Sequence, residues 1–214
     1  MVGNKDPKMT NPCDKYRQET LRLRTSEART WVTNAARSFV DFLTRPTKSP
    51  ARDVVTKAMQ EHFGLTSKSD PTARQAEARL QEVITKIQSR FSSPFYSECS
   101  NRDAGPAAAE INSERSKQLN GNYIIYHNLF WNLTKVGSRE VIKRRRAQSR
   151  AIVHEVAHLS IGSGIDVYGH KDAYPGDPMT ALRNADSYAW FIHDVATNRI
   201  SRKQDRLAEL AEEE

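Results

Sequence analysis

The chain has 214 residues, of which 37% are hydrophobic and 28% are charged, a composition that suits one globular domain and excludes a disordered or collagen-like chain. Lys and Arg outnumber Asp and Glu by 33 to 26, giving a net charge of +7. Such a charge can attract nucleic acid, an anionic membrane or an acidic protein, but it is also typical of a solvated basic surface. No run of about eighteen apolar residues occurs, so the sequence predicts no transmembrane helix.

The N-terminal segment carries no apolar run of the kind that a secretory signal peptide requires. We interpret residues 1–26 as a loose arm, and we expect a chain that stays in the cytoplasm or leaves it by a non-classical route. Cys13 and Cys99 are too few for a disulfide framework, and their surroundings give no reason to predict that they pair.

Apolar residues at helical spacing predict three helices in the first half of the chain, over residues 26–45, 54–63 and 71–91. Gly64 follows the second of these helices as a C-terminal cap, and Pro71 stands in the first turn of the third. The first half of the chain is therefore expected to be helical.

The next two stretches are rich in aromatic and β-branched residues: FYSECS (residues 95–100) and NYIIYHNLFWN (residues 122–132). They predict short strands of a small antiparallel sheet. The second stretch is either an edge strand that pairs with an extended peptide substrate or an ordinary core strand. Its histidine, His127, is interpreted as a half-buried strand residue rather than a metal ligand.

Helical character returns at Ser138 and ends at Gly162, and a last helix opens with Asp177 as its cap. Residues 201–214 form a charged tail without a wide apolar face. Together, these elements predict an α+β, mainly helical fold, with a single domain over residues 27–200.

The helix that begins at Ser138 contains HEVAH, from His154 to His158. Residues four apart lie on one face of a helix, so both imidazoles can bind one zinc ion. Glu155 lies beside that face, where it can hold a water molecule and accept its proton. The alternative is a core histidine pair without a metal, which is disfavoured because burying Glu155 beside it would be costly.

A catalytic zinc site needs a third protein ligand and an open fourth position for water. A third histidine six residues after the second is excluded because Gly164 stands there, and no glutamate occurs between Leu159 and Leu207. Asp166 is favoured, because Gly162 and Gly164 allow the chain to turn back toward the metal. The other candidates for this ligand are His170, Asp172, Asp177, Asp186, His193 and Asp194.

Three segments, HEVAH, GSGIDVYG and RNADSYAWF, resemble the motifs of the aspzincins, a family that comprises the deuterolysins and the lysine-specific metalloendopeptidases. The resemblance covers residues 27–200. It implies a zincin-like metalloprotease fold with an HExxH active-site helix, one zinc ion per chain, and Asp166 as the third ligand. It also implies that Tyr168 stabilises the oxyanion, although the D-x-Y-G spacing here is one residue shorter than in the family.

The resemblance further implies that Asp186, the aspartate of the NAD motif, binds the side chain that follows the cleaved bond. In lysine-specific members a second carboxylate stands three residues further on, where this chain has Ala189. The usual disulfides of the family cannot all form with two cysteines, which favours a relative adapted to a reducing compartment, such as a bacterial effector or toxin.

We therefore expect a zinc-dependent endopeptidase that acts on protein or peptide substrates, spans no membrane and is a monomer. KRRR, at residues 143–146, is interpreted as a solvated helix face, so a nucleic-acid partner is not expected. One alternative is a catalytically inactive relative. Another is a basic nucleic-acid-binding module with a structural zinc, which is disfavoured because structural sites use four protein ligands, usually with cysteine.

Overall fold

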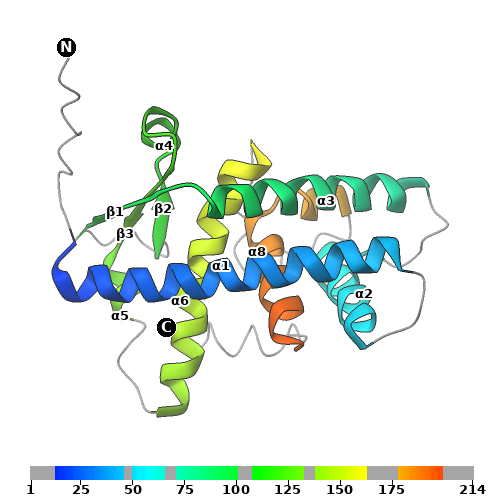
Figure 1. Ribbon diagram of the computed structural model, residues 1–214, viewed down its shortest axis with the longest axis horizontal. Helices are drawn as coiled ribbons and strands as arrows, with labels where there is room; N and C mark the ends of the chain where they lie inside the picture. The colour runs from blue at the N-terminus through cyan, green and yellow to red at the C-terminus, as the bar shows by residue number, and fades with distance from the viewer. Residues whose placement is uncertain are drawn as a thin grey trace.

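The computed structural model (Figure 1) describes residues 13–45, 50–65, 71–100, 108–132, 138–162 and 178–199. Within these ranges the chain forms α1 (Lys15–Thr44), α2 (Pro50–Phe63), α3 (Pro71–Phe91), β1 (Phe95–Cys99), β2 (Ala109–Ile111), α4 (Ser113–Gln118), β3 (Asn122–Tyr126), α5 (Asn128–Asn132), α6 (Ser138–Ile161), α7 (Pro178–Ala181) and α8 (Ala185–Thr197). The prediction of a mainly helical fold with a small sheet is confirmed. No helix in this described part is both long and apolar enough to cross a membrane.

α1 begins at Lys15, and not near Ser26 as the sequence predicted, so much of the expected arm is helical. Asp14 caps the helix, because its carboxylate accepts a hydrogen bond from a backbone N–H of the first turn. The apolar pattern missed this part of the helix because Leu21 is its only buried residue. Ion pairs between residues three apart support it instead.

The three strands form one mixed sheet in the order β1-β3-β2. β3 pairs in parallel with β1 and antiparallel with β2, so the prediction of an antiparallel sheet was wrong. The sequence did not reveal β2, and the long connection through β2 and α4 lets β3 run in the same direction as β1. β3 is the central strand, so the edge-strand hypothesis for residues 122–132 was also wrong, and the end of that stretch forms α5.

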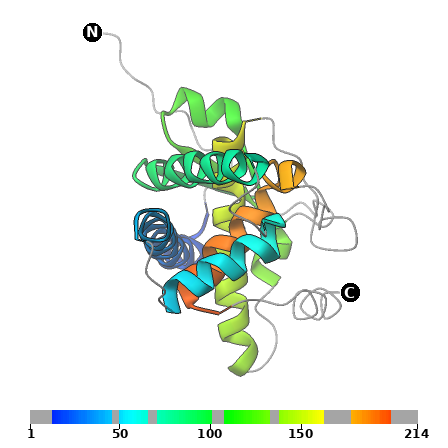
Figure 2. The ribbon, with the colours of Figure 1, turned by 90° about the vertical axis from the view of Figure 1, so that its right-hand side faces the viewer.

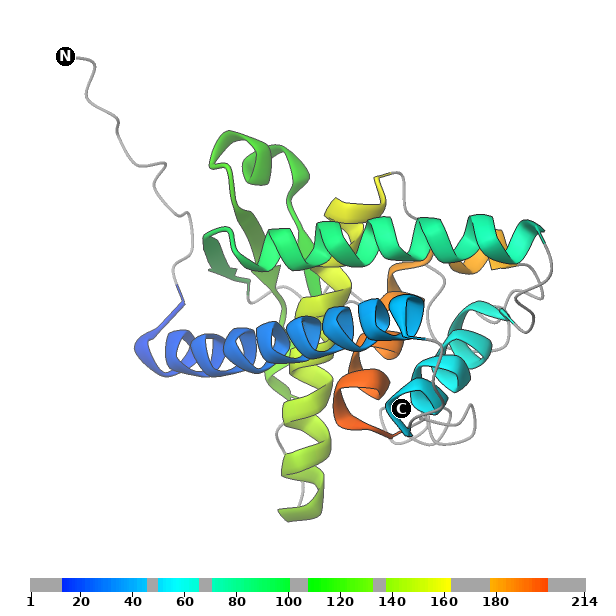
Figure 3. The same ribbon diagram turned by 45° about the vertical axis from the view of Figure 1, so that its right-hand side comes forward.

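The helices pack around α8. α1 and α3 lie side by side and α6 runs across them (Figures 1 and 3). α8 packs against α1, α2 and α6, and ten of its 13 residues are buried. Figure 2 looks along α1 and shows α2, α6 and α8 to one side of it. The most buried helix of the described chain therefore carries the NAD motif at its start.

The prediction of a helix from Ser138 is confirmed by α6, which is followed by Gly162 with a φ of +90°, a conformation that favours glycine. The predicted last helix is divided into α7 and α8. The division falls at Asn184, whose side chain accepts a hydrogen bond of 3.2 Å from the backbone N–H of Asp186 and so starts α8. Asp177, the predicted cap, lies outside the described residues.

Cys13 and Cys99 form a disulfide, which joins the chain just before α1 to the end of β1. Their Cα atoms are 4.9 Å apart and both residues are buried. Nothing local along the chain indicated this pairing, because the contact requires the start of α1 to lie beside the sheet (Figure 1). The expectation that Cys13 and Cys99 do not pair was therefore wrong.

Candidate metal centre and active site

His154 and His158 lie one turn apart on α6, and their Nε2 atoms are 3.0 Å apart. The two rings meet at an interplanar angle of 75°. Two nitrogens bound to one tetrahedral zinc ion, each at 2.0–2.1 Å, would lie about 3.3 Å apart. The pair therefore fits a shared zinc ion with only a small adjustment.

The rest of this helix fixes the direction of the two imidazoles. Val153, Val156 and Ala157 are fully buried, and they hold one side of α6 in the core. His154 and Glu155 are buried as well, with exposures of 7% and 6%. Ionisable side chains are seldom buried in a plain core, so their burial here favours a functional site.

Glu155 lies close to Tyr126, the last residue of β3. Burial is the main cause that raises the pKa of Tyr126, and the negative charge of Glu155 raises that pKa further. The phenol therefore keeps its proton and is able to donate it in a hydrogen bond. Sequence reasoning missed Tyr126, because nothing local marks which aromatic residue of this strand faces α6.

Asp186 reaches the site from the first turn of α8. Its Oδ1 atom lies 3.7 Å from Nδ1 of His154, the ring nitrogen that does not face His158. That separation is longer than a hydrogen bond, but the negative charge of the carboxylate still favours the tautomer with the proton on Nδ1, which leaves the Nε2 lone pair for a metal. The structure thus brings the predicted substrate-binding residue next to a predicted metal ligand.

Asp194 and His193, two candidates for the third ligand, belong to a separate cluster in the core. Asp194 is fully buried, and its carboxylate oxygens are hydrogen-bonded to Nε2 of His62 at 2.8 Å and to Nδ1 of His193 at 2.9 Å. The cluster joins α2 to α8. Sequence reasoning treated His62 as an ordinary residue, because its partner lies 132 positions away.

The third ligand is not found within the described ranges of the chain. No group of three or more His, Cys, Asp or Glu residues in these ranges is placed to hold a metal ion. Asp186 therefore does not complete a three-ligand set with the two histidines. The remaining predicted residues, namely Asp166, Tyr168, His170, Asp172 and Asp177, lie outside the described residues.

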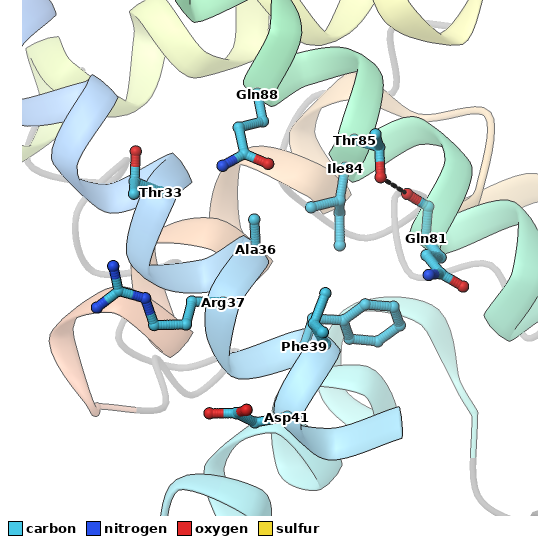
Figure 4. A pocket seen from close by; sticks show the side chains of 10 residues that line it. Thr33, Ala36, Arg37, Phe39, Asp41, Gln81, Ile84, Thr85 and Gln88 are labelled. Atoms are coloured by element: carbon cyan, nitrogen blue, oxygen red, sulfur yellow. Dashed lines mark hydrogen bonds between the residues drawn. The ribbon is translucent and has the colours of Figure 1, made fainter. Parts of the chain in front are cut away.

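A cavity of about 270 Å³ lies between α1 and α3 (Figure 4). Phe39 and Ile84 form its apolar part, and Arg37, Gln81 and Gln88 are among its polar lining residues. No candidate metal ligand or catalytic residue lines it. We therefore assign this cavity no part in the site.

Comparison with known proteins gave matches of two kinds. The family model of the aspzincins, described as lysine-specific metallo-endopeptidase, matches residues 49–193. Among solved structures, the chain is similar to a zinc peptidase from Grifola frondosa, with a TM-score of 0.58 and 21% sequence identity; the match covers 85% of this chain and 97% of that one. At this identity, the likeness is one of fold. No curated protein matches the sequence.

Proposed function

The chain belongs to the aspzincin family of metallo-endopeptidases, and from that premise we propose that it is a zinc-dependent endopeptidase. Family membership supports a zinc ion and a protein or peptide substrate. The observation that carries the proposal is the pair of Nε2 atoms 3.0 Å apart on α6, beside the buried Glu155. Asp166 is proposed as the third protein ligand, with His154 and His158 as the other two.

The proposed mechanism assigns one role to each residue. When bound, zinc lowers the pKa of a water molecule and polarises the carbonyl of the scissile bond. Glu155 would accept the proton of the attacking water and pass it to the leaving amine. Asp186 holds His154 in the tautomer that binds a metal. Tyr168 donates a hydrogen bond to the oxyanion as it develops.

Among the described residues no further strand pairs with the outer edge of β2, and this edge supports a place for an extended substrate. β2 is an edge strand, and its Ala109 pairs with Tyr126, which lies close to Glu155. A peptide that added to β2 as a further strand would therefore run past the candidate base.

Asp186 is also proposed to meet the side chain that follows the cleaved bond. Its own side chain is 19% exposed, whereas Ala189, at the position of the second carboxylate of lysine-specific members, is fully buried. We therefore expect a tolerant enzyme with at most a mild preference for Lys or Arg there. The measurement is cleavage of a peptide library, varied at that position, by wild type and Asp186→Asn. A strict lysine requirement would contradict the tolerance, and a basic preference that survives in Asp186→Asn would exclude Asp186 from this role.

The central test combines metal content with activity. Purified protein should hold one zinc ion per chain and cleave denatured casein, and a chelator should stop cleavage until zinc is restored. Glu155→Gln should keep its zinc and its circular dichroism spectrum but lose nearly all activity, because an amide cannot accept the proton. Zinc-loaded wild type that cleaves nothing would indicate an inactive relative, and an active Glu155→Gln would contradict the mechanism.

We also propose that the protein is exported from the cell that makes it and acts as a secreted effector. The Cys13–Cys99 disulfide supports export, because such bonds persist in oxidising compartments. Alkylation of free thiols in fractions of a producing culture, followed by mass spectrometry, tests this. Reduced protein confined to the cytoplasm would contradict export.

A further inference from the structure

Glu110 is the middle residue of the edge strand β2, and its side chain is 57% exposed. Within the described part of the chain its one ion-pair partner is His127, whose Nε2 atom lies 3.7 Å from Oε1 of Glu110. That separation is longer than a hydrogen bond. The carboxylate therefore lies exposed at the sheet edge, and no residue that the structure describes forms a hydrogen bond with it.

The register of β2 shows which backbone groups the edge presents. His127 N–H donates to the carbonyl of Ala108 at 3.0 Å, and Asn112 N–H donates to the carbonyl of Tyr123 at 2.9 Å. Backbone groups of alternate strand residues point the same way, so Glu110 also bonds toward β3. The backbone groups of the two residues beside it, Ala109 and Ile111, are directed away from β3, toward the free edge.

The side chains of β2 alternate between the two faces of the sheet. Ala109 is buried and shares a face of the sheet with its partner Tyr126, whose pKa is raised by burial and by the negative charge of Glu155 on α6. Glu110 lies on the other face, level with its partner Ile125. A strand bound antiparallel to β2 would bond to its free groups, so the residue opposite Glu110 would form a pair without hydrogen bonds. Side chains are closest in such pairs.

A second glutamate on the same face differs from Glu110. Glu98 of β1 also lies level with Ile125. Its carboxylate accepts a hydrogen bond of 2.6 Å from the Tyr123 hydroxyl, and it lies 3.7 Å from a guanidinium nitrogen of Arg115. Its charge is therefore offset within the protein. Glu110 combines an exposed carboxylate with a place on the edge that a substrate would use.

We propose that Glu110 makes the enzyme prefer a lysine or arginine at the substrate position that pairs with it across the edge of β2. This inference rests on the proposed function, and it adds a second acidic contact, separate from Asp186, on the path of the substrate. Opposite charges in a cross-strand pair stabilise each other modestly, so the preference should be about two- to five-fold in kcat/KM.

The test is cleavage of a peptide library in which each position near the cut is varied in turn. Zinc-loaded wild type should favour Lys or Arg at one position, Glu110→Gln should lose this preference, and Glu110→Lys should reverse it in favour of Asp or Glu. Glu114→Gln, which removes an exposed glutamate from the nearby α4, is the matched control and should leave it unchanged. An unchanged preference in Glu110→Gln, or an equal loss in Glu114→Gln, would overturn the proposal.

A binding measurement separates this inference from the peptidase proposal. Zinc-loaded Glu155→Gln should bind a short peptide with Lys at alternate positions about two- to five-fold more tightly than the same peptide with Glu there. Adding Glu110→Gln should remove the difference. If wild type cleaves nothing but this difference persists, the peptidase proposal fails and the role of Glu110 stands. If casein is cleaved and no difference in binding exists, the role of Glu110 is overturned.

Discussion

The candidate metal centre depends on two kinds of contact at the scale of single residues. The first is local: His154 and His158 converge because residues four apart meet on one face of α6. The second is distant: Asp186 approaches the other nitrogen of His154 from α8, at 3.7 Å. A metal ligand and a residue that orients a ligand should respond differently to removal, which allows the two roles to be distinguished.

Zinc should be lost more readily from Asp166→Ala than from Asp186→Ala. Asp166→Ala removes a proposed ligand and should empty the site at chelator concentrations that wild type resists. Asp186→Ala removes only the partner of His154, so it should weaken zinc binding by about 10–100-fold. The measurement is zinc content after dialysis against graded chelator. Loss of zinc from Asp186→Ala at a lower chelator concentration than from Asp166→Ala would show that the ligand assignment is wrong.

Tyr168 is tested by removing one hydroxyl. Tyr168→Phe should lower kcat by about 10–1000-fold, the range expected for one donor to the oxyanion. Zinc content should not change, because the phenol is not a proposed ligand. The measurement is steady-state cleavage of a fluorogenic peptide. Full activity would show that the shorter D-x-Y-G spacing carries the tyrosine away from the oxyanion.

At the scale of elements, the position of α8 matters most, because this helix carries Asp186 at its start. α8 is joined to α2 through the hydrogen bond between Asp194 and His62, whose side chains are both fully buried. Aromatic contacts strengthen the same interface, since Phe63 of α2 meets the ring of Tyr188 at 5.1 Å. A buried carboxylate that loses a hydrogen-bond partner is costly, so this link should be measurable.

His62→Ala should therefore lower the free energy of unfolding by more than the packing loss alone, by about 1–3 kcal/mol for the missing hydrogen bond. His127→Ala is the matched control: His127 is also buried, but neither of its ring nitrogens has a hydrogen-bond partner among the residues that the structure describes. Urea unfolding followed by circular dichroism gives both values. An equal loss in the two variants would show that the bond to Asp194 adds nothing.

At the scale of the whole molecule, the disulfide connects the start of α1 to the small sheet. Cys13 precedes α1, and Cys99 ends β1, 86 positions later. A cross-link that closes so long a loop restricts the unfolded chain strongly. The bond therefore stabilises the fold as a whole rather than any one element.

Removing the disulfide should lower the free energy of unfolding by about 2–5 kcal/mol. The variant with both Cys13→Ser and Cys99→Ser should melt at a lower temperature than wild type under oxidising conditions. A reducing agent should lower the Tm of wild type but leave that of the double variant unchanged, which controls for other effects of the reagent. Equal melting of the two proteins without reductant would contradict the disulfide.

The sequence by itself determined what depends on neighbours along the chain. The apolar period gave α2, α3 and α6 nearly to their ends, Gly64 marked a helix end, and HEVAH gave two imidazoles on one face, because helical spacing is a local property. The motifs together indicated the family that the comparison confirmed.

Only the tertiary structure decided what depends on contacts between distant segments. It made β3 the central strand rather than an edge strand, and it paired Cys13 with Cys99. It also placed Asp186 beside His154 and hydrogen-bonded Asp194 to the imidazole of His62 on α2. The physical reason is that none of these contacts leaves a periodic trace in the sequence. Each depends on how whole elements pack, and a strand of three residues such as β2 is too short to show an alternation of its own.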